Sequence, residues 1–233
     1  MNRLRIASFD IGKKNFSFYI EEFIPINIEF SDQRYNVDGT CTQVFENIIV
    51  NNVFNNGKSI LLENIDLTFD TDKKMYLDPR IFTNMTNILD ERQSFWDDVD
   101  IFVIEKQMSF RNKYNTMALK LGQHCYSYFN ITYGDSKNIV EFPAYYKTQL
   151  LGCKKDKTKK NKYKAISKPK RKLWNISKAI DILKVRSEKR CGSGVAIEDQ
   201  DEYIKLIMNS KKKDDLCDVI CQLQAYKIKN YII

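Results

Sequence analysis

The sequence has 233 residues, of which 43% are hydrophobic and 12% aromatic, enough to fold around a core and to argue against a disordered chain. Its net charge of +8 favours a polyanionic partner. It contains neither a run of 18 apolar residues nor the core of a signal peptide, so we expect an intracellular protein without a membrane-spanning helix.

Apolar patterns predict β-strands in the first half of the chain. The strands are predicted at residues 3–10, 15–23, 42–50 and 59–69. Residues 12–14 supply a tight turn after the first strand, and residues 55–57 supply a turn signal before the fourth. The spacing of apolar residues over 79–96 favours a helix.

Strands and helices alternate in the second half. Strands are predicted at residues 99–107 and 138–142, a loop at 191–194, and helices at 114–129, 147–152, 173–188, 201–208 and 213–229. Antiparallel strands followed by this alternation predict an α/β fold, with a mixed β-sheet flanked by helices. We expect a single domain over residues 1–233.

Four carboxylates occupy positions where apolar residues would be expected. Asp10 ends the first strand, Glu105 interrupts a later one, and Asp215 and Asp218 lie on the apolar last helix. An ionised carboxylate in a dry site is costly unless an opposite charge compensates it. The four acids therefore predict a Mg²⁺ site, because Mg²⁺ prefers carboxylate oxygens and also takes substrate phosphates. For Asp10 alone, a turn residue before Gly12 is the milder alternative.

The geometry of the last helix separates its acids. Its apolar residues centre on one face: Leu216, Val219, Ile220, Leu223 and Tyr226. Asp215 lies about 80° from that centre, Asp218 about 140° and Asp214 about 180°. Asp215 and Asp218, about 60° apart, can reach one metal site, whereas Asp214 points away from the core. The alternative is an ordinary helix start, where acids are stabilised by the positive end of the helix macrodipole. That explanation suits Asp214 well and Asp218 poorly.

The positive charge is concentrated in residues 154–172. This basic segment holds ten lysines and one arginine against one aspartate, a net charge of +10, so the rest of the chain carries about −2. We expect it to bind nucleic-acid phosphates, with Tyr163 and Trp174 as candidate stacking groups. The predicted DNA-binding residues are Lys154, Lys155, Lys157, Lys159, Lys160, Lys162, Lys164, Lys168, Lys170, Arg171 and Lys172. A solvated loop or a nuclear localisation signal at 168–172 is the alternative.

Other chemistries find little support. The six cysteines are scattered without a CxxC spacing, which favours buried free thiols over a zinc site. The one histidine, His124, is expected on a helix face and argues against a Ser-His-Asp hydrolase. Residues 56–59 end like a phosphate-binding P-loop, but Asn52 stands where the first glycine is required.

Taken in order, these residues resemble a known family. Phe9-Asp10-Ile11-Gly12, Ile104-Glu105-Lys106-Gln107 and Asp215-Leu216-Cys217-Asp218 resemble the motifs of the RuvC-like branch of the ribonuclease H superfamily. Residues 143–152, in which Lys147 precedes a short helix ending in glycine, resemble that branch's lysine motif. The ordered set is similar to the poxvirus-type Holliday junction resolvases of large cytoplasmic DNA viruses.

The resemblance implies a ribonuclease H-like fold and a Mg²⁺-dependent homodimer that cuts four-way DNA junctions by paired symmetric incisions, in recombination and repair in the host cytoplasm. It implies that two Mg²⁺ ions, replaceable by Mn²⁺, are held by four acids: Asp10, Glu105, Asp215 and Asp218. Lys147 would contact the scissile phosphate or nearby water. Long insertions after Asp10 and after Lys147 leave substrate preference and dimer geometry open. The alternatives are a ribonuclease H-type enzyme, a nuclease for other branched DNA, and a nucleic-acid-binding protein without activity.

Overall fold

The computed structural model describes residues 3–71, 75–76, 78–107, 115–191 and 198–233. Its strands are β1 (Leu4–Asp10), β2 (Phe16–Phe23), β3 (Gly57–Ile65), β4 (Ile101–Lys106), β5 (Asn138–Pro143), β6 (Asp156–Lys157) and β7 (Tyr163–Lys164). Its helices are α1 (Gln43–Ile49), the π-helix η1 (Val50–Phe54), α2 (Arg80–Glu91), α3 (Gln93–Trp96), α4 (Thr116–Tyr133), the 3₁₀ turn η2 (Gly134–Ser136), α5 (Tyr145–Leu150), α6 (Lys168–Cys191), α7 (Glu198–Asn209) and α8 (Lys213–Tyr231).

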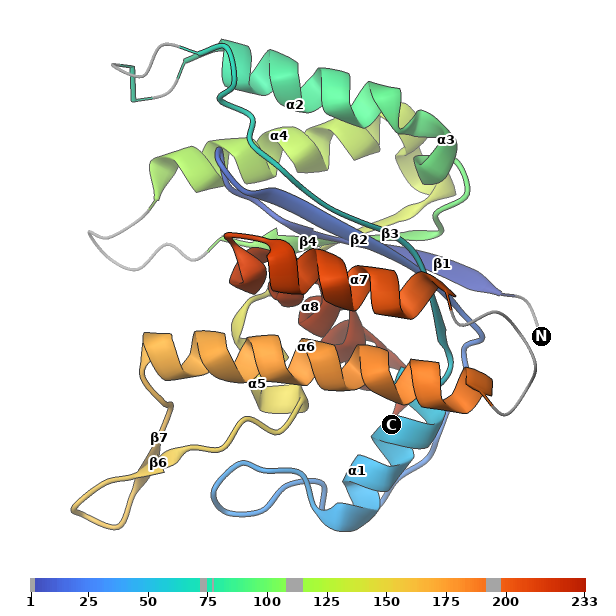
Figure 1. Ribbon diagram of the computed structural model, residues 1–233, viewed down its shortest axis with the longest axis vertical. Helices are drawn as coiled ribbons and strands as arrows, with labels where there is room; N and C mark the ends of the chain where they lie inside the picture. Colours follow the sequence, from blue (N-terminus) through green and yellow to red (C-terminus); the bar gives the residue numbers. More distant parts are fainter. Residues whose placement is uncertain (1–2, 72–74, 77, 108–114, 192–197) are drawn as a thin grey trace.

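Five strands form one sheet in the order β3-β2-β1-β4-β5. The pairs β1–β2 and β2–β3 are antiparallel, whereas β1–β4 and β4–β5 are parallel. Helices α2, α3 and α4 lie on one side of the sheet, and α6, α7 and α8 lie on the other (Figure 1). The predicted α/β fold, a mixed β-sheet flanked by helices, is confirmed.

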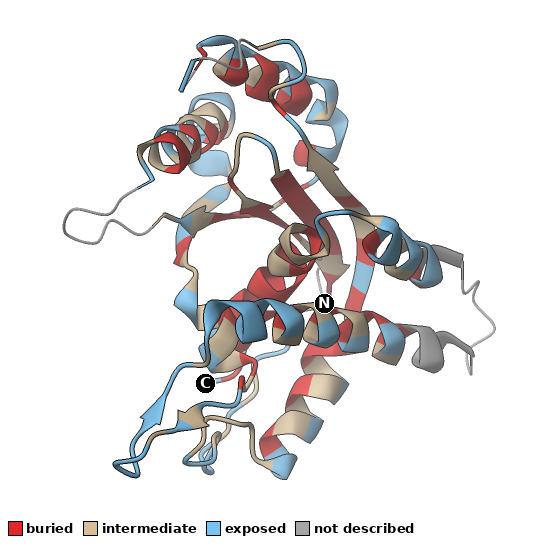
Figure 2. Ribbon diagram, turned by 60° about the vertical axis from the view of Figure 1, so that its left-hand side comes forward, coloured by how far each residue is buried: buried red, intermediate tan, exposed pale blue. Residues whose placement is uncertain are grey.

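Side-chain alternation divides the two central strands between two cores, because successive residues of a strand face opposite sides of the sheet. Ala7 and Phe9 pack with α2 and α4, where Phe9, Trp96 and Phe129 form part of an aromatic cluster. Ile6 and Val103 pack on the opposite face with α8. Figure 2 shows buried residues gathered in the strands and on the helix faces turned toward them.

Helix α8 runs through the second core. All residues from Val219 to Ile228 are buried, so the helix is covered on every side rather than along the single predicted apolar face. Its later turns contribute a buried cation, Lys227, whose Nζ lies 2.6 Å from Glu21 Oε1 of β2. Arg186 of α6 reaches the other oxygen of Glu21 at 2.7 Å. This buried group joins α6 and α8 to the sheet.

Two predicted elements differ most from the structure, while the strand predicted at 59–69 is observed as β3 at 57–65 and the helix predicted at 79–96 is divided into α2 and α3. Residues 42–50 form helix α1 rather than a strand, with the Thr42 hydroxyl accepting a hydrogen bond from Phe45 N as its N-cap. The two buried residues of α1, Phe45 and Ile49, are four apart, which is helical spacing. Helix α6 begins five residues before the predicted start at residue 173, inside the basic segment. The predicted loop at 191–194 lies outside the described residues except for Cys191, which ends α6.

Smaller expectations can also be compared with the structure. Cys41, Cys125, Cys153, Cys217 and Cys221 are free, and all except Cys41 are buried. The histidine, on helix α4, has its Nε2 2.9 Å from the hydroxyl of Thr86. Within the described residues, no helix is both long and apolar enough to cross a membrane.

Candidate active site

The two strand carboxylates are brought together by the register of the sheet. Ser8 pairs with Val103 in the parallel ladder, and continuing that register by two residues places Asp10 beside Glu105. Both acids share strand parity with Ile6 and Val103, so they project on the α8 side of the sheet. Burial and then the charge of Glu105 raise the pKa of Asp10 well above its usual range.

The first turns of α8 carry the other two predicted acids. Asp215 and Asp218 are half-buried, and the Oδ2 atom of Asp215 is buried without a hydrogen-bond partner. Burial and the neighbouring charge of Asp214 raise the pKa of Asp215 to about 6. Burial likewise raises the pKa of Asp218. These shifts arise because several carboxylates share a partly dry site, where a cation would favour their ionised forms.

Lys147 joins the strand acids to the helix acids. It lies on α5, and the positive φ of Gly152 (+74°) closes the turn after that short helix. Its Nζ is 3.1 Å from Glu105 Oε2 and 3.4 Å from Asp218 Oδ1, and its side chain is 8% exposed. Burial alone would lower the pKa of Lys147, but the nearby carboxylates outweigh burial and raise it. Lys147 is therefore a charged ammonium among the acids.

Helix α6 supplies two contacts that the sequence did not predict. The Asn175 amide donates to Asp218 Oδ1, and Lys172 forms an ion pair with Asp214. Asp214, which helical geometry predicted to point away from the core, meets a basic residue of α6, and only 18% of its side-chain surface is exposed. No local pattern identified Asn175, because its partner lies 43 residues further along the chain.

A second unpredicted contact fixes α8 to the strands that carry the acids. The buried Gln222 lies one helical turn after Asp218, and its Nε2 is 3.1 Å from each of three acceptors: Ser8 Oγ, Phe9 O and Val103 O. These acceptors precede Asp10 and Glu105 by one or two residues. A glutamine inside the apolar helix was the available sequence signal, since a buried amide needs partners.

A cleft of about 760 Å³ opens beside the acids. Glu105, Lys147 and Asp218 line it together with five basic residues: Lys154, Lys155, Lys168, Arg171 and Lys172. The other six predicted DNA-binding residues lie further out on the β6–β7 hairpin and the start of α6: Lys157, Lys159, Lys160, Lys162, Lys164 and Lys170. All eleven are exposed.

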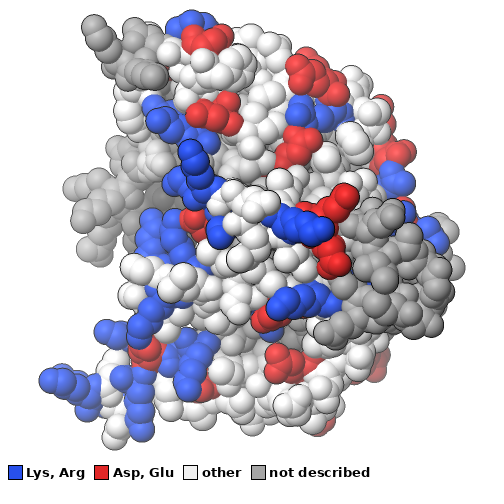
Figure 3. Space-filling view, viewed as in Figure 1, with Lys and Arg blue, Asp and Glu red and all other residues white. Residues whose placement is uncertain are grey.

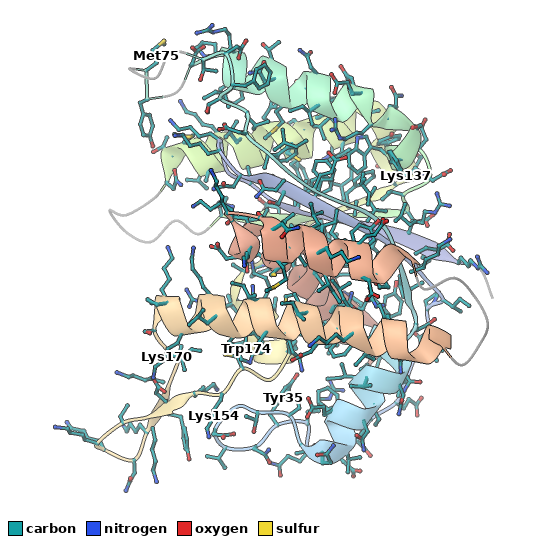
Figure 4. The ribbon with its side chains drawn as sticks, viewed as in Figure 1. Tyr35, Met75, Lys137, Lys154, Lys170 and Trp174 are labelled. Carbon is teal, nitrogen blue, oxygen red and sulfur yellow. The ribbon has the colours of Figure 1, made fainter. Side chains whose placement is uncertain are left out.

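The basic segment is thus neither a detached arm nor a plain loop. Lysine and arginine side chains gather over the hairpin and the start of α6, at the left of Figure 3. Figure 4 places Lys154, Lys170 and Trp174 on this side of the molecule. Trp174 is half-buried, whereas Tyr163 is 37% exposed. A polyanion on this surface would lie next to the acids.

The donor set fits a hard divalent cation, although the acids are not closed into a cage. Across the described part of the chain, no three Asp, Glu, Cys or His side chains are grouped as a ready-made metal site. Lys147 Nζ instead bridges Glu105 and Asp218. The unpartnered buried oxygen of Asp215 is a free carboxylate donor of the kind that Mg²⁺ prefers. Carboxylates from three separate elements supply the remaining donors.

No protein-family model matches the chain. The chain is 37% identical over 234 residues to the uncharacterized protein 170L of Invertebrate iridescent virus 6, covering 95% of this chain and 88% of that protein. It is 29% identical over 238 residues to the uncharacterized protein 97L of Invertebrate iridescent virus 3, covering 95% and 98%.

Among solved structures, the chain is similar to two Holliday junction proteins. The fowlpox virus Holliday junction resolvase aligns with a TM-score of 0.48 and 15% identity, over 97% of this chain and 99% of that chain. RuvC of T. thermophilus, in complex with a Holliday junction substrate, aligns with a TM-score of 0.47 and 10% identity, over 97% and 95%.

Proposed function

We propose that this chain, which belongs to the same family as protein 170L of Invertebrate iridescent virus 6, is a metal-dependent endonuclease that resolves four-way DNA junctions by paired symmetric cuts. The observation that carries the proposal is the buried Lys147 between Glu105 and Asp218, beside a cleft that these three residues line together with basic side chains. Acids that bind metal, a lysine that contacts phosphate and a basic surface that binds DNA can together support phosphodiester hydrolysis. The sequence motifs add the substrate class.

In this proposal the metal ligands are the four predicted acids: Asp10, Glu105, Asp215 and Asp218. Two Mg²⁺ ions, or Mn²⁺ in their place, would supply the charge that stabilises the attacking and leaving oxygens. The raised pKa values of Asp10, Asp215 and Asp218 support a cation here, because each reflects an ionised form that lacks sufficient positive charge.

Lys147 would act as a fixed positive charge at the scissile phosphate. Its burial and its two acidic neighbours keep the ammonium in place, so little reorganisation is needed when a phosphate enters. The basic segment would bind the DNA backbone, which positions the substrate without reading its sequence. We therefore expect weak sequence preference and a strong dependence of binding on salt.

A four-way junction offers two equivalent strands, and one chain holds one set of acids. Symmetric cutting therefore calls for two copies related by a two-fold axis, so we propose a homodimer. We place its action in the host cytoplasm, in keeping with the motif resemblance to resolvases of large cytoplasmic DNA viruses.

The deciding experiment incubates the purified protein with a synthetic four-way junction, with and without Mg²⁺, and maps the cuts on every strand. Paired cuts placed symmetrically about the branch point, seen only with metal, are expected. Flaps, RNA–DNA hybrids and linear duplex should be cut more slowly; preference for hybrid would favour a ribonuclease H-type enzyme instead.

A variant pair separates an enzyme from a binding protein. Asp10→Asn and Glu105→Gln should each abolish cutting while junction binding remains. If neither the wild-type protein nor any metal condition gives cutting but the junction is bound, the chain is a binding protein. Cutting that survives both substitutions would show that the active site lies elsewhere.

A further inference from the structure

Asn175 is a buried polar residue at the edge of the candidate metal site. It lies in α6, just after the basic residues that open this helix, and is 4% exposed. Its amide nitrogen donates to Asp218 Oδ1, and its backbone oxygen accepts a hydrogen bond from Cys221 Sγ, 3.6 Å away. Its own Oδ1 atom is buried without a hydrogen-bond partner. An unpaired buried oxygen is costly, so the position is not optimised for packing alone.

The contacts between α6 and the acids of α8 follow a regular pattern. Lys172 holds Asp214 and Asn175 holds Asp218, so each acid that flanks Asp215 has a partner from α6. The buried Oδ2 atom of Asp215, between them in sequence, has no hydrogen-bond partner. Residues 172 and 175 are three apart, which places them on one side of α6.

The two partners differ in charge, and the difference matters for a metal. Lys172 neutralises Asp214, which we do not assign as a ligand. Asn175 is neutral, so it orients the carboxylate of Asp218 without cancelling its charge. A neutral donor that fixes one oxygen of a ligand carboxylate leaves the other oxygen directed and negative.

We infer that Asn175 is a positioning residue that orients the Asp218 carboxylate for divalent-metal binding, from the same helix whose first turn carries DNA-binding lysines. The inference rests on the proposed metal-dependent function. Asn175 would not touch the reacting atoms; it would act through Asp218. Loss of a residue that hydrogen-bonds a metal ligand typically weakens metal affinity by about 10–100-fold.

The test measures Mn²⁺ binding by the whole protein in the absence of DNA, using the electron paramagnetic resonance of free Mn²⁺. Asn175→Leu keeps the branching of the side chain at Cγ but removes the donor, and Asn175→Gln keeps an amide. Asn130→Leu is the matched control, because Asn130 is an exposed helical asparagine that donates only to the carbonyl of Tyr126. Circular dichroism and melting curves check folding; if the leucine variant does not fold, Asn175→Ala replaces it.

We expect Asn175→Leu to weaken Mn²⁺ binding by about 10–100-fold, with Asn175→Gln closer to wild type and Asn130→Leu unchanged. The Mn²⁺ concentration for half-maximal cutting should rise in parallel, and excess metal should restore the maximal rate, while junction affinity stays constant. Wild-type Mn²⁺ affinity in Asn175→Leu, or equal loss in the leucine and glutamine variants, would overturn the role of Asn175. A wild-type protein that binds no Mn²⁺ but still cuts would overturn the metal site itself.

Discussion

Replacing Lys147 by methionine tests whether this lysine is the internal counter-charge of the acids. Methionine keeps much of the side-chain length but leaves Glu105 and Asp218 facing each other without a cation. Removing one partner of a buried ion pair costs about 3–5 kcal/mol. Glu105 and Asp218 keep 15% and 28% of their side-chain surface exposed, so solvent screens part of the effect and the lower end applies.

That loss can be measured as a melting temperature. For a chain of this length, 1 kcal/mol shifts the melting temperature by about 2–4 °C, so a loss of about 3 kcal/mol predicts a drop of about 6–12 °C without metal. Mg²⁺ should recover part of the drop, because bound metal stabilises the folded state by mass action and takes over the missing charge. Junction cutting should be lost while junction binding is retained.

Lys106→Met is the matched control for this experiment. Lys106 follows Glu105 directly, is 56% exposed and lies 3.5 Å from Glu141, so its loss should cost at most about 1 kcal/mol. Lys147→Arg retains the charge and should melt closer to wild type. If Lys147→Met and Lys106→Met melt alike in metal-free buffer, Lys147 does not balance the acids.

Other buried groups of the structure give four more expected outcomes. Glu21→Gln should destabilise the protein by about 3–5 kcal/mol in denaturant unfolding, because it removes the charge shared by two buried cations; Glu22→Gln on the other face of the strand should cost far less, and similar values would contradict the buried network. Gln222→Glu should destabilise more than Gln222→Met at neutral pH, since it turns a carboxylate toward three acceptors; the reverse order in thermal melts would refute the assigned amide. Mn²⁺ affinity should fall as the pH drops through about 6, because the raised pKa of Asp215 lets a proton compete with the metal; titrations at several pH values that show constant affinity would exclude Asp215 as a ligand. In metal-free protein the same group should make stability decline as the pH rises from about 4 to about 6, because the folded state holds that proton more tightly than the unfolded chain does.

The acids could be predicted from sequence because each one breaks a local pattern. A carboxylate at the end of an apolar strand, or on an apolar helix, stands out against the apolar residues next to it in the sequence. Strand parity and register then determine that Asp10 and Glu105 face α8. The strands β1, β2 and β4 were predicted nearly at their observed bounds, because their apolar patterns are also local in the sequence.

The remaining parts of the site could not be predicted, because their partners are distant in sequence. Asn175 meets Asp218 across 43 residues, and Gln222 meets Ser8 across 214. The prediction of a strand at residues 42–50 was wrong for a local reason. Their apolar residues fit both a strand and a helix over so short a window, and the Thr42 N-cap with Phe45 and Ile49 four residues apart decides for the helix.

The central position of α8 has a consequence for how the protein is made. The strand that carries Asp10 leaves the ribosome early, but its partners Gln222 and Asp218 are synthesised some two hundred residues later. Contacts of such long sequence separation form late in folding. The strand acids and the helix acids therefore stay apart until α8 has been synthesised, and under the proposed function a chain that lacks α8 could not cut nucleic acid.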